Sequence, residues 1–189
     1  MKIALHICCA VCAAGSAESL IREGHEVHGF FYNPNIYPEE EYQLRLNNAR
    51  KVSEQMGFQL FEGQYEAGEW NDRVKLLVEE PEGGRRCLVC YRIRLEKTYQ
   101  YMLDSGCEAF TTTLTMGSNK PALVLGKIGQ TIGGETFLQC DFKKKDGFKR
   151  AGELARQWGL YRQHYCGCKY SLPKPIERFK IFNIPTDEV

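Results

Sequence analysis

The chain has 189 residues, of which 43% are hydrophobic, and its formal net charge is only +1. A chain of this length is typically one domain that buries about 70% of its unfolded surface, so its stability needs no covalent staples. The lack of a long apolar run excludes a membrane-spanning helix, and His6 interrupts the first apolar stretch, which argues against a secretory leader.

Strand and helix patterns alternate along the chain. In chain order, hydrophobic spacing and the positions of glycine and proline predict a strand over 2–7, a helix over 12–23, a strand over 26–32, a helix over 39–57, a strand over 58–62, a helix over 67–80, a turn over 80–86, a helix over 87–105, a strand over 107–113, a helix over 120–133, a strand over 135–142, a helix over 147–159 and a loop over about 160–175. About five alternations predict an α/β protein, a three-layer parallel sheet in one domain spanning residues 1–189. The site of such a fold lies beyond the carboxyl ends of its strands.

Nine cysteines make up about 5% of the residues, fewer than in disulfide scaffolds, and they predict a reducing cytoplasm where clustered thiols bind metal or do redox work. Seven of them fall where an α/β fold builds its site. They are Cys8, Cys9 and Cys12 after the first strand, Cys87 and Cys90 at the start of a helix, and Cys166 and Cys168 in the last loop. The other two, Cys107 and Cys140, are expected to be small core residues.

Two pairs with C-x-x-C spacing, Cys9–Cys12 and Cys87–Cys90, predict a metal site, because this spacing lets both sulfurs reach one metal. The 74 residues between Cys12 and Cys87 exceed the spacing of a local zinc ribbon, about 15–20 residues. A shared metal would therefore join the first strand to a distant helix. Four cysteines can bind zinc or an iron–sulfur cluster, and the surplus of thiols favours a redox-active centre.

Cys166 and Cys168 are separated by a single glycine. A disulfide at this spacing closes a very tight ring, which should be strained and easily reduced. The pair therefore suits a redox relay. The alternative is that both cysteines are additional metal ligands.

Charge is distributed unevenly between the two halves of the chain. Residues 1–84 hold 7 basic and 14 acidic residues, a balance of −7, whereas residues 85–180 hold 18 and 8, a balance of +10. A basic half can offer a face to a polyanion such as RNA, although each basic residue alone could be a solvated surface charge. The candidate phosphate contacts are Arg85, Arg86, Lys143, Lys144, Lys145, Lys149 and Arg150.

Six motifs carry a family resemblance. They are HICCAVC, YNPNIYPEEEYQLR, GGRRCLVCYRIRLEKT, FTTTLTMGSNK, CDFKKKDG and YRQHYCGCKYS, and in this order the chain resembles the QueH-type epoxyqueuosine reductases from His6 to about Ser171. One departure is Val11, which stands where the family pattern has proline. The resemblance implies an adenine-nucleotide-hydrolase-like fold, related to the PP-loop enzymes and Rossmann-like. It also implies removal of the epoxide oxygen of epoxyqueuosine in the anticodon loop of tRNA, which gives queuosine without cobalamin.

The resemblance also implies a cofactor. It puts a [4Fe–4S] cluster on Cys8, Cys9, Cys87 and Cys90 and makes Cys166 and Cys168 a redox-active pair. The electron donor stays unidentified. Cys12 has no place in this ligand set.

Cys12 and Asp141 could hold a second, mononuclear iron that acts as a Lewis acid on the departing oxygen. Without that metal, Asp141, His164 or Tyr165 could donate a proton. The Asp141 carboxylate could equally cap the turn in which it lies.

Two other functions compete with this interpretation. An ATP-dependent PP-loop enzyme that modifies tRNA would share the fold, but the turn after the first strand lacks the glycine- and serine-rich phosphate loop. A zinc-stabilised RNA-binding module without chemistry would share the cysteines. ATP binding would favour the first alternative, and zinc without absorbance near 400 nm the second.

Overall fold

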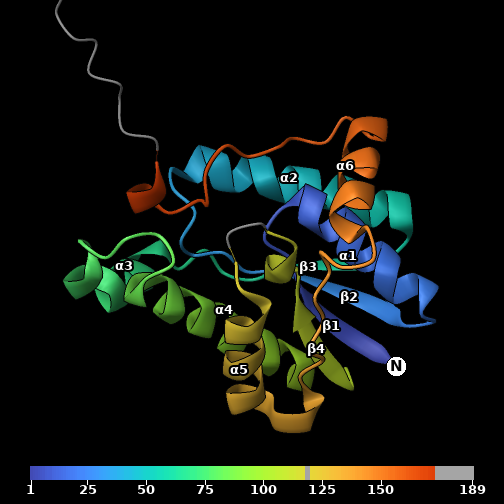
Figure 1. Ribbon diagram of the computed structural model, residues 1–189, viewed down its shortest axis with the longest axis horizontal. Helices are drawn as coiled ribbons and strands as arrows, with labels where there is room; N and C mark the ends of the chain where they lie inside the picture. Colours follow the sequence, from blue (N-terminus) through green and yellow to red (C-terminus); the bar gives the residue numbers. More distant parts are fainter. Residues whose placement is uncertain (118–119, 173–189) are drawn as a thin grey trace, which may run out of the picture.

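The computed structural model describes residues 1–117 and 120–172, and it has four parallel strands with helices on both sides (Figure 1). In chain order the elements are β1 (Lys2–His6), α1 (Ala10–Arg22), β2 (Glu26–Phe31), α2 (Glu39–Met56), β3 (Gln59–Glu62), α3 (Ala67–Val74), α4 (Arg85–Asp104), β4 (Ala109–Thr112), α5 (Ala122–Gly133) and α6 (Gly147–Gln157). None of the described helices is long and apolar enough to span a membrane. Residues 173–175 of the predicted last loop lie outside the described residues.

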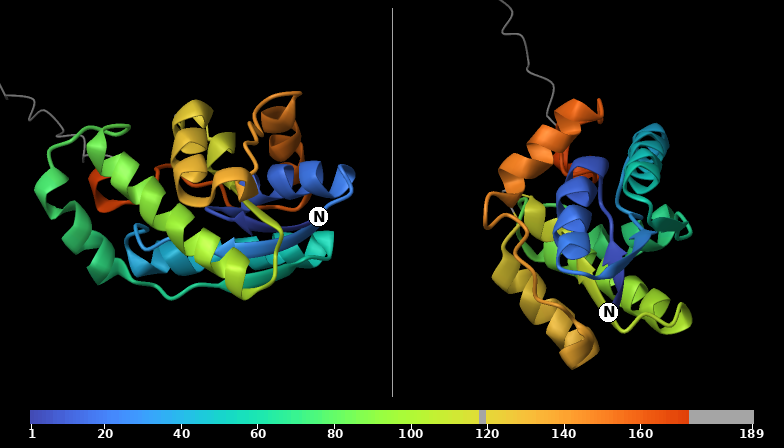
Figure 2. Two further views of the ribbon diagram at one scale, coloured as in Figure 1. Left: turned by 90° about the horizontal axis from the view of Figure 1, so that it is seen from below. Right: turned by 90° about the vertical axis from the view of Figure 1, so that its right-hand side faces the viewer.

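The strand order in the sheet is β3-β2-β1-β4, and every neighbouring pair is parallel. The helices α1, α2 and α6 cover one face and α3, α4 and α5 the other, so the prediction of three layers is confirmed (Figure 2). The chain runs outward from β1 to β3 and then returns to place β4 on the other side of β1. The strand order therefore reverses between β1 and β4, and their carboxyl ends define the switch point at which α/β folds bind ligands.

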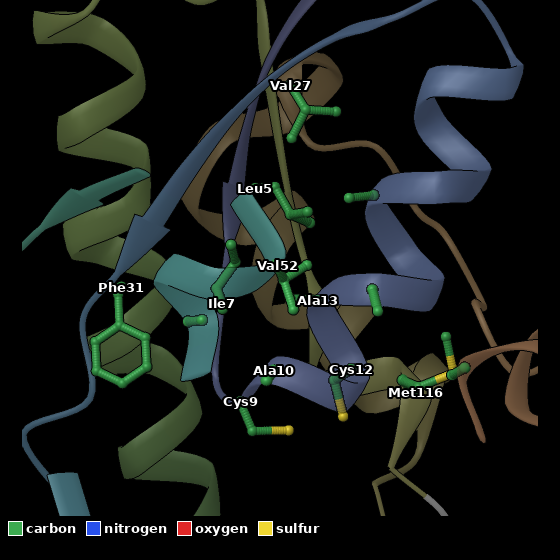
Figure 3. Packing of buried hydrophobic residues seen from close by; sticks show 14 of the residues in the cluster. Leu5, Ile7, Cys9, Ala10, Cys12, Ala13, Val27, Phe31, Val52 and Met116 are labelled. Carbon is green, nitrogen blue, oxygen red and sulfur yellow. The ribbon is translucent and has the colours of Figure 1, made fainter. Parts of the chain in front are cut away.

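The core on the α1 face ends at two cysteines. Leu5 and Ile7 project from β1 and its extension toward Ala13 of α1, and all three are fully buried. Figure 3 shows Cys9 and Cys12 at the end of this packed layer, where α1 begins. The small residues of α1 let the helix lie close to the sheet, which fixes its first turn relative to the carboxyl end of β1.

Close packing also joins α1 to α6. A Cβ atom added to Gly15 would lie 2.8 Å from both Ala151 Cβ and Met116 Cε. Glycine at this position therefore lets α6 approach the middle of α1. The contact holds the segment that leads into α6 beside the turns that follow β1 and β4.

The predicted strand over 135–142 is wrong. Only one bridge forms there, between Phe110 of β4 and Phe137, and a short 3-10 turn occupies Gly134–Thr136. The amide of Leu138 donates to the carbonyl of Phe110, but the carbonyl of Leu138 accepts the hydroxyl of Thr111 instead of a backbone amide. Because a side chain takes the place of the next ladder hydrogen bond, strand pairing ends after one residue.

Predicted helix boundaries also differ from the structure, and α1 begins at Ala10, two residues before its predicted start. The helix predicted over 67–80 ends at Val74 and continues only as a 3-10 turn over Lys75–Leu77. The turn predicted over 80–86 is shorter, because α4 begins at Arg85. Gly84 is the extended residue before α4, and the Glu80 carboxylate accepts the first free amide of the helix, that of Arg85.

Replacing Gly15 by alanine should destabilise the protein. The added methyl gains about 1 kcal/mol of helix propensity but overpacks the α1–α6 contact, which costs more, about 1–3 kcal/mol. Gly68→Ala in α3 is the matched control, because a Cβ there meets nothing within 4 Å. Urea unfolding should show a loss of stability for Gly15→Ala and a gain for Gly68→Ala; gains of equal size would contradict the close α1–α6 contact.

Candidate functional site

Three thiols gather at the switch point, on the turn from β1 to α1. The sulfurs of Cys8, Cys9 and Cys12 all lie within 4.8 Å of one another, and Cys8 Sγ is 3.9 Å from Cys9 Sγ. Cys9 is the residue that caps α1, and Cys12 lies in its first turn, so the helix brings both sulfurs to one side. The distance between Cys8 Sγ and Cys9 Sγ is close to the sulfur–sulfur distance in a tetrahedral site with 2.3 Å metal–sulfur bonds, which is about 3.8 Å. The three thiols therefore have the spacing and the chemistry of a metal site.

Hydrogen-bond donors face these sulfurs. The hydroxyl of Thr113, just past β4, lies 3.3 Å from Cys8 Sγ, and the side-chain amide of Gln163 lies 3.1 Å from Cys9 Sγ. The Cys12 and Cys9 thiols hydrogen-bond to Cys8 and hold its pKa well below its ordinary value. The same bonds to Cys8 and Cys9, together with burial, hold the pKa of Cys12 well above it. The Cys8 thiol therefore loses its proton readily, whereas the other thiols of this cluster lose theirs only when a cation binds.

His6 lies beneath the thiols and is fully buried. Its Nε2 donates to the carbonyl of Tyr32, 3.1 Å away, so its Nδ1 accepts the hydroxyl of Thr112 at 2.9 Å. Burial, and then the positive charge of Arg94, lower the pKa of His6 to about 4. The ring is therefore neutral and ties the carboxyl ends of β1, β2 and β4 together.

Cys87 and Cys90 lie in the first turns of α4, on the other side of the sheet. Both are buried, and burial raises the pKa of each, to about 11 for Cys90. The amide of Gly83 donates to Cys87 Sγ at 3.2 Å. Cys8 packs against the apolar cluster that contains Cys87. Among the described residues, however, the one group of three or more metal-binding side chains within 4.8 Å is Cys8, Cys9 and Cys12.

The loop that carries Cys166 and Cys168 places their side chains in different surroundings. Cys166 is half-buried and lines a cavity with Cys8 and Cys12, whereas Cys168 is buried in the apolar cluster of Cys90. Gly167 between them has a φ of +126°, and a Cβ there would lie 3.1 Å from Ile36. Only glycine suits this conformation and space. The loop thus connects the two groups of cysteines, and all nine cysteines are free thiols.

Arg45 of α2 holds this loop in place. The Arg45 guanidinium donates to the carbonyls of Cys166 at 3.0 Å and Tyr165 at 3.1 Å, and it pairs with Glu41 at 2.7 Å. Its side chain is 2% exposed. A buried, fully bonded arginine of this kind fixes the position of a loop that has little regular structure.

Two further cations line the thiol cavity, which has a volume of about 330 Å³. The buried Arg94 of α4 donates to the carbonyl of Cys90, and its Nη2 has no partner within the described part of the chain. Lys120 Nζ lies 3.4 Å from Cys166 Sγ. Burial alone would lower the pKa of each cation, but the neighbouring cysteines and Tyr91 together outweigh burial and raise both pKa values. The cavity is therefore suited to negative charge.

Asp141 does not line this cavity. Its carboxylate accepts the amide of Lys143 at 3.4 Å, as a turn cap does, and it lines a separate cavity of about 560 Å³ between α1 and α6. A second iron on Cys12 and Asp141 stays a prediction, and the structure brings Cys12 to Cys8 and Cys9 instead.

Three of the predicted phosphate contacts are occupied by bonds within the protein. Arg86 is buried and donates to three backbone carbonyls, Lys143 Nζ donates to the carbonyls of Gly117 and Lys120, and Arg150 pairs with Glu18. Four others are exposed: Arg85, Lys144, Lys145 and Lys149. Of these, Lys144 and Lys145 line the same separate cavity as Asp141.

Sequence reasoning missed Arg45, Arg94, Lys120 and Gln163 as site residues. All four lie within the motifs that carry the family resemblance. Their positions within these motifs could have marked them as candidate site residues. Their roles, however, depend on contacts between segments that are far apart in the chain. Arg45, for example, bonds residues 120 and 121 positions away.

The fold and the site together define an α/β protein with a parallel sheet in which thiols occupy the turn after the first strand. The chain is similar to a solved structure titled NMN synthetase from Francisella tularensis, with a TM-score of 0.50, 12% identity, and coverage of 87% of this chain and 66% of that chain. At this identity the likeness shows the fold alone.

A family model described as epoxyqueuosine reductase QueH matches residues 3–174. Relatives named epoxyqueuosine reductase QueH include one from Streptococcus pyogenes, 34% identical over 90% of this chain and 70% of its own length. Another, from Thermotoga maritima, is 34% identical over 93% of both chains. The chain belongs to the epoxyqueuosine reductase QueH family, a family of oxidoreductases.

Replacing Arg45 by lysine should loosen the cysteine loop. Lysine keeps the charge but loses the forked donors, and we expect a loss of about 1–3 kcal/mol of stability. The amide of Tyr37, which donates to the Gly167 carbonyl, should exchange faster with deuterium. The control is Arg50→Lys on the same helix, where the exposed pair with Glu62 contributes less than about 1 kcal/mol. Equal exchange in the two variants would show that Arg45 does not hold the loop.

Proposed function

We propose that this protein reduces epoxyqueuosine in the anticodon loop of tRNA to queuosine, removing the epoxide oxygen as water without cobalamin. Membership of the epoxyqueuosine reductase QueH family supports the reaction. The proposal rests on the thiol cavity at the switch point, which Cys8, Cys12 and Cys166 line together with three cations, Arg45, Arg94 and Lys120. Nine free thiols favour a cytoplasmic setting.

The residues present fit a bound iron centre. Three sulfurs with metal-ligand spacing receive hydrogen bonds from Thr113 and Gln163, and such bonds to sulfur tune the potential of an iron–sulfur cluster. We propose that Cys8, Cys9, Cys87 and Cys90 hold a [4Fe–4S] cluster. This cluster would supply electrons one at a time.

The chain's own dithiol can supply both electrons that the reaction needs. Opening an epoxide to an alkene requires two electrons and two protons, which is what Cys166 and Cys168 release when they form a disulfide. Cys166 lines the cavity, and Cys168 lies in the apolar cluster that contains Cys90. The pair therefore has one sulfur near the proposed substrate and one near the proposed cluster. A separate electron donor must then reduce the disulfide.

Two alternative functions make different demands on the site. An ATP-dependent enzyme needs free backbone amides on the turn after β1, but the amide of Cys8 donates to Thr113 Oγ1 at 3.1 Å. A zinc-stabilised RNA-binding module is compatible with the spacing of Cys8, Cys9 and Cys12, because that spacing suits one tetrahedral ion. Metal identity is therefore the observation that separates this module from the proposed reductase.

Single cysteine substitutions should distinguish the cysteines that bind the cluster from those that do not. In anaerobically purified protein, Cys8→Ala, Cys9→Ala, Cys87→Ala and Cys90→Ala should each lower iron and acid-labile sulfide together to less than about half of the wild-type content. Cys107→Ala and Cys140→Ala are controls outside the site and should keep both. Cys12→Ala distinguishes a second metal, because loss of iron without sulfide would indicate a mononuclear site. Zinc in place of iron in the wild type, with full metal content in the four variants, would contradict the cluster assignment.

RNA binding should depend on Lys144 and Lys145, two exposed lysines that line the cavity between α1 and α6. With about four phosphate contacts, the slope of log affinity against log salt should be about −3, since each contact contributes about 0.7. Replacing Lys144 and Lys145 together by alanine should flatten the slope by about 1.4. The control replaces Lys51 and Lys75, exposed lysines of the acidic half. Titrating anticodon stem-loop RNA at several salt concentrations tests this, and equal slopes for the two double variants would place the RNA elsewhere.

A further inference from the structure

Lys120 is held at the edge of the thiol cavity by its own backbone. It lies just before α5, its amide donates to the carbonyl of Gly117 at 3.2 Å, and its carbonyl accepts Lys143 Nζ at 3.0 Å. These bonds fix the main chain independently of the Lys120 side chain. The side chain is not needed to hold the backbone, and it lines the cavity together with Cys8 and Cys166.

The ammonium group of Lys120 has thiols for neighbours. Nζ lies 3.4 Å from Cys166 Sγ, and the other charges that act on it are those of Cys8, Tyr91 and Arg94. Among the described residues no carboxylate pairs with Lys120. A half-buried lysine without a carboxylate keeps its proton here because the cavity gathers negative charge on sulfur, which raises the pKa of the lysine.

Other groups in or near the cavity are poorly placed to give a proton to a substrate there. Asp141 lines the other cavity, and the Tyr165 hydroxyl donates to the carbonyl of Tyr37. His6 is fully buried with both ring nitrogens bonded. Arg94 keeps its proton at any ordinary pH. Glu82 and His164 line the cavity but are exposed to solvent, whereas Lys120 reaches a reacting sulfur directly.

We propose that Lys120 is a catalytic residue that protonates the epoxide oxygen, an assignment that rests on the proposed function. The ammonium delivers a proton to the oxygen as the first carbon–oxygen bond breaks. The thiols of Cys166 and Cys168 supply two electrons as their sulfur–sulfur bond forms. One of their protons completes the departing water and the other restores the ammonium. Epoxide and dithiol thus give alkene, disulfide and water, and both carbon–oxygen bonds are broken.

The test is an anaerobic single turnover with anticodon stem-loop RNA that carries epoxyqueuosine. Lys120→Ala should slow the formation of queuosine about 10²- to 10³-fold, as expected when a general acid is removed. Its iron and sulfide content and its affinity for the RNA should stay as in the wild type. Lys120→Arg should remain slow, because a guanidinium keeps the charge but does not release its proton. Lys127→Ala, which removes an exposed lysine of α5, should leave the rate unchanged.

Added ammonium ions distinguish proton donation from charge alone. Ethylammonium fits the space left by the missing side chain and should restore part of the rate of Lys120→Ala in a saturable manner. Tetramethylammonium has the same charge but no proton, and it should not. Equal rescue by both ions would overturn the assignment, and so would a Lys120→Ala rate equal to that of the wild type. In either case, an active wild-type protein leaves the proposed function intact. A wild-type protein that does not consume the epoxide overturns both.

Discussion

Three sulfurs lie within 4.8 Å of one another on a single turn, and the rest of the site is arranged around the negative charge that they can carry. The bonds among the thiols make Cys8 easy to ionise and Cys12 hard to ionise. Arg94 comes from α4 and Lys120 from the segment before α5, and both place a cation beside the sulfurs. The neutral His6 adds no charge but connects three strand ends below them. The fold therefore presents a cavity in which cations lie beside the sulfurs, of which Cys8 is the one that ionises most easily.

The parallel sheet explains why this site lies where it does. In α/β folds the turn after the first strand and the end of the neighbouring strand meet at the switch point, and phosphate commonly binds there to free amides. In this chain Thr113, just past β4, bonds both the amide and the sulfur of Cys8. The same position in the fold is thus used for sulfur chemistry. The loop held by Arg45 adds a second pair of thiols from the other end of the chain.

The sequence predicted the layers well because helix and strand periodicity is a local property. It failed at the strand over 135–142, because a single side-chain hydrogen bond from Thr111 ends the pairing with β4. The site was predicted to lie at the strand ends, where the structure brings Cys8, Cys9 and Cys12 together and places Cys166 in the same cavity as Cys8 and Cys12. The close contact of Cys12 with Cys8 depends on where α1 begins, two residues earlier than predicted. The contact of Lys120 with Cys166 joins segments 46 residues apart, which no local pattern encodes.

In the proposed reaction, the chain's own thiols supply the electrons for epoxide removal. The most direct measurement is a single turnover of fully reduced protein with epoxyqueuosine-containing RNA, without oxygen or added reductant, followed by alkylation of free thiols and mass spectrometry of both products. We expect one disulfide between Cys166 and Cys168 to form for each queuosine. Formation of queuosine while both thiols remain free to alkylation would contradict it.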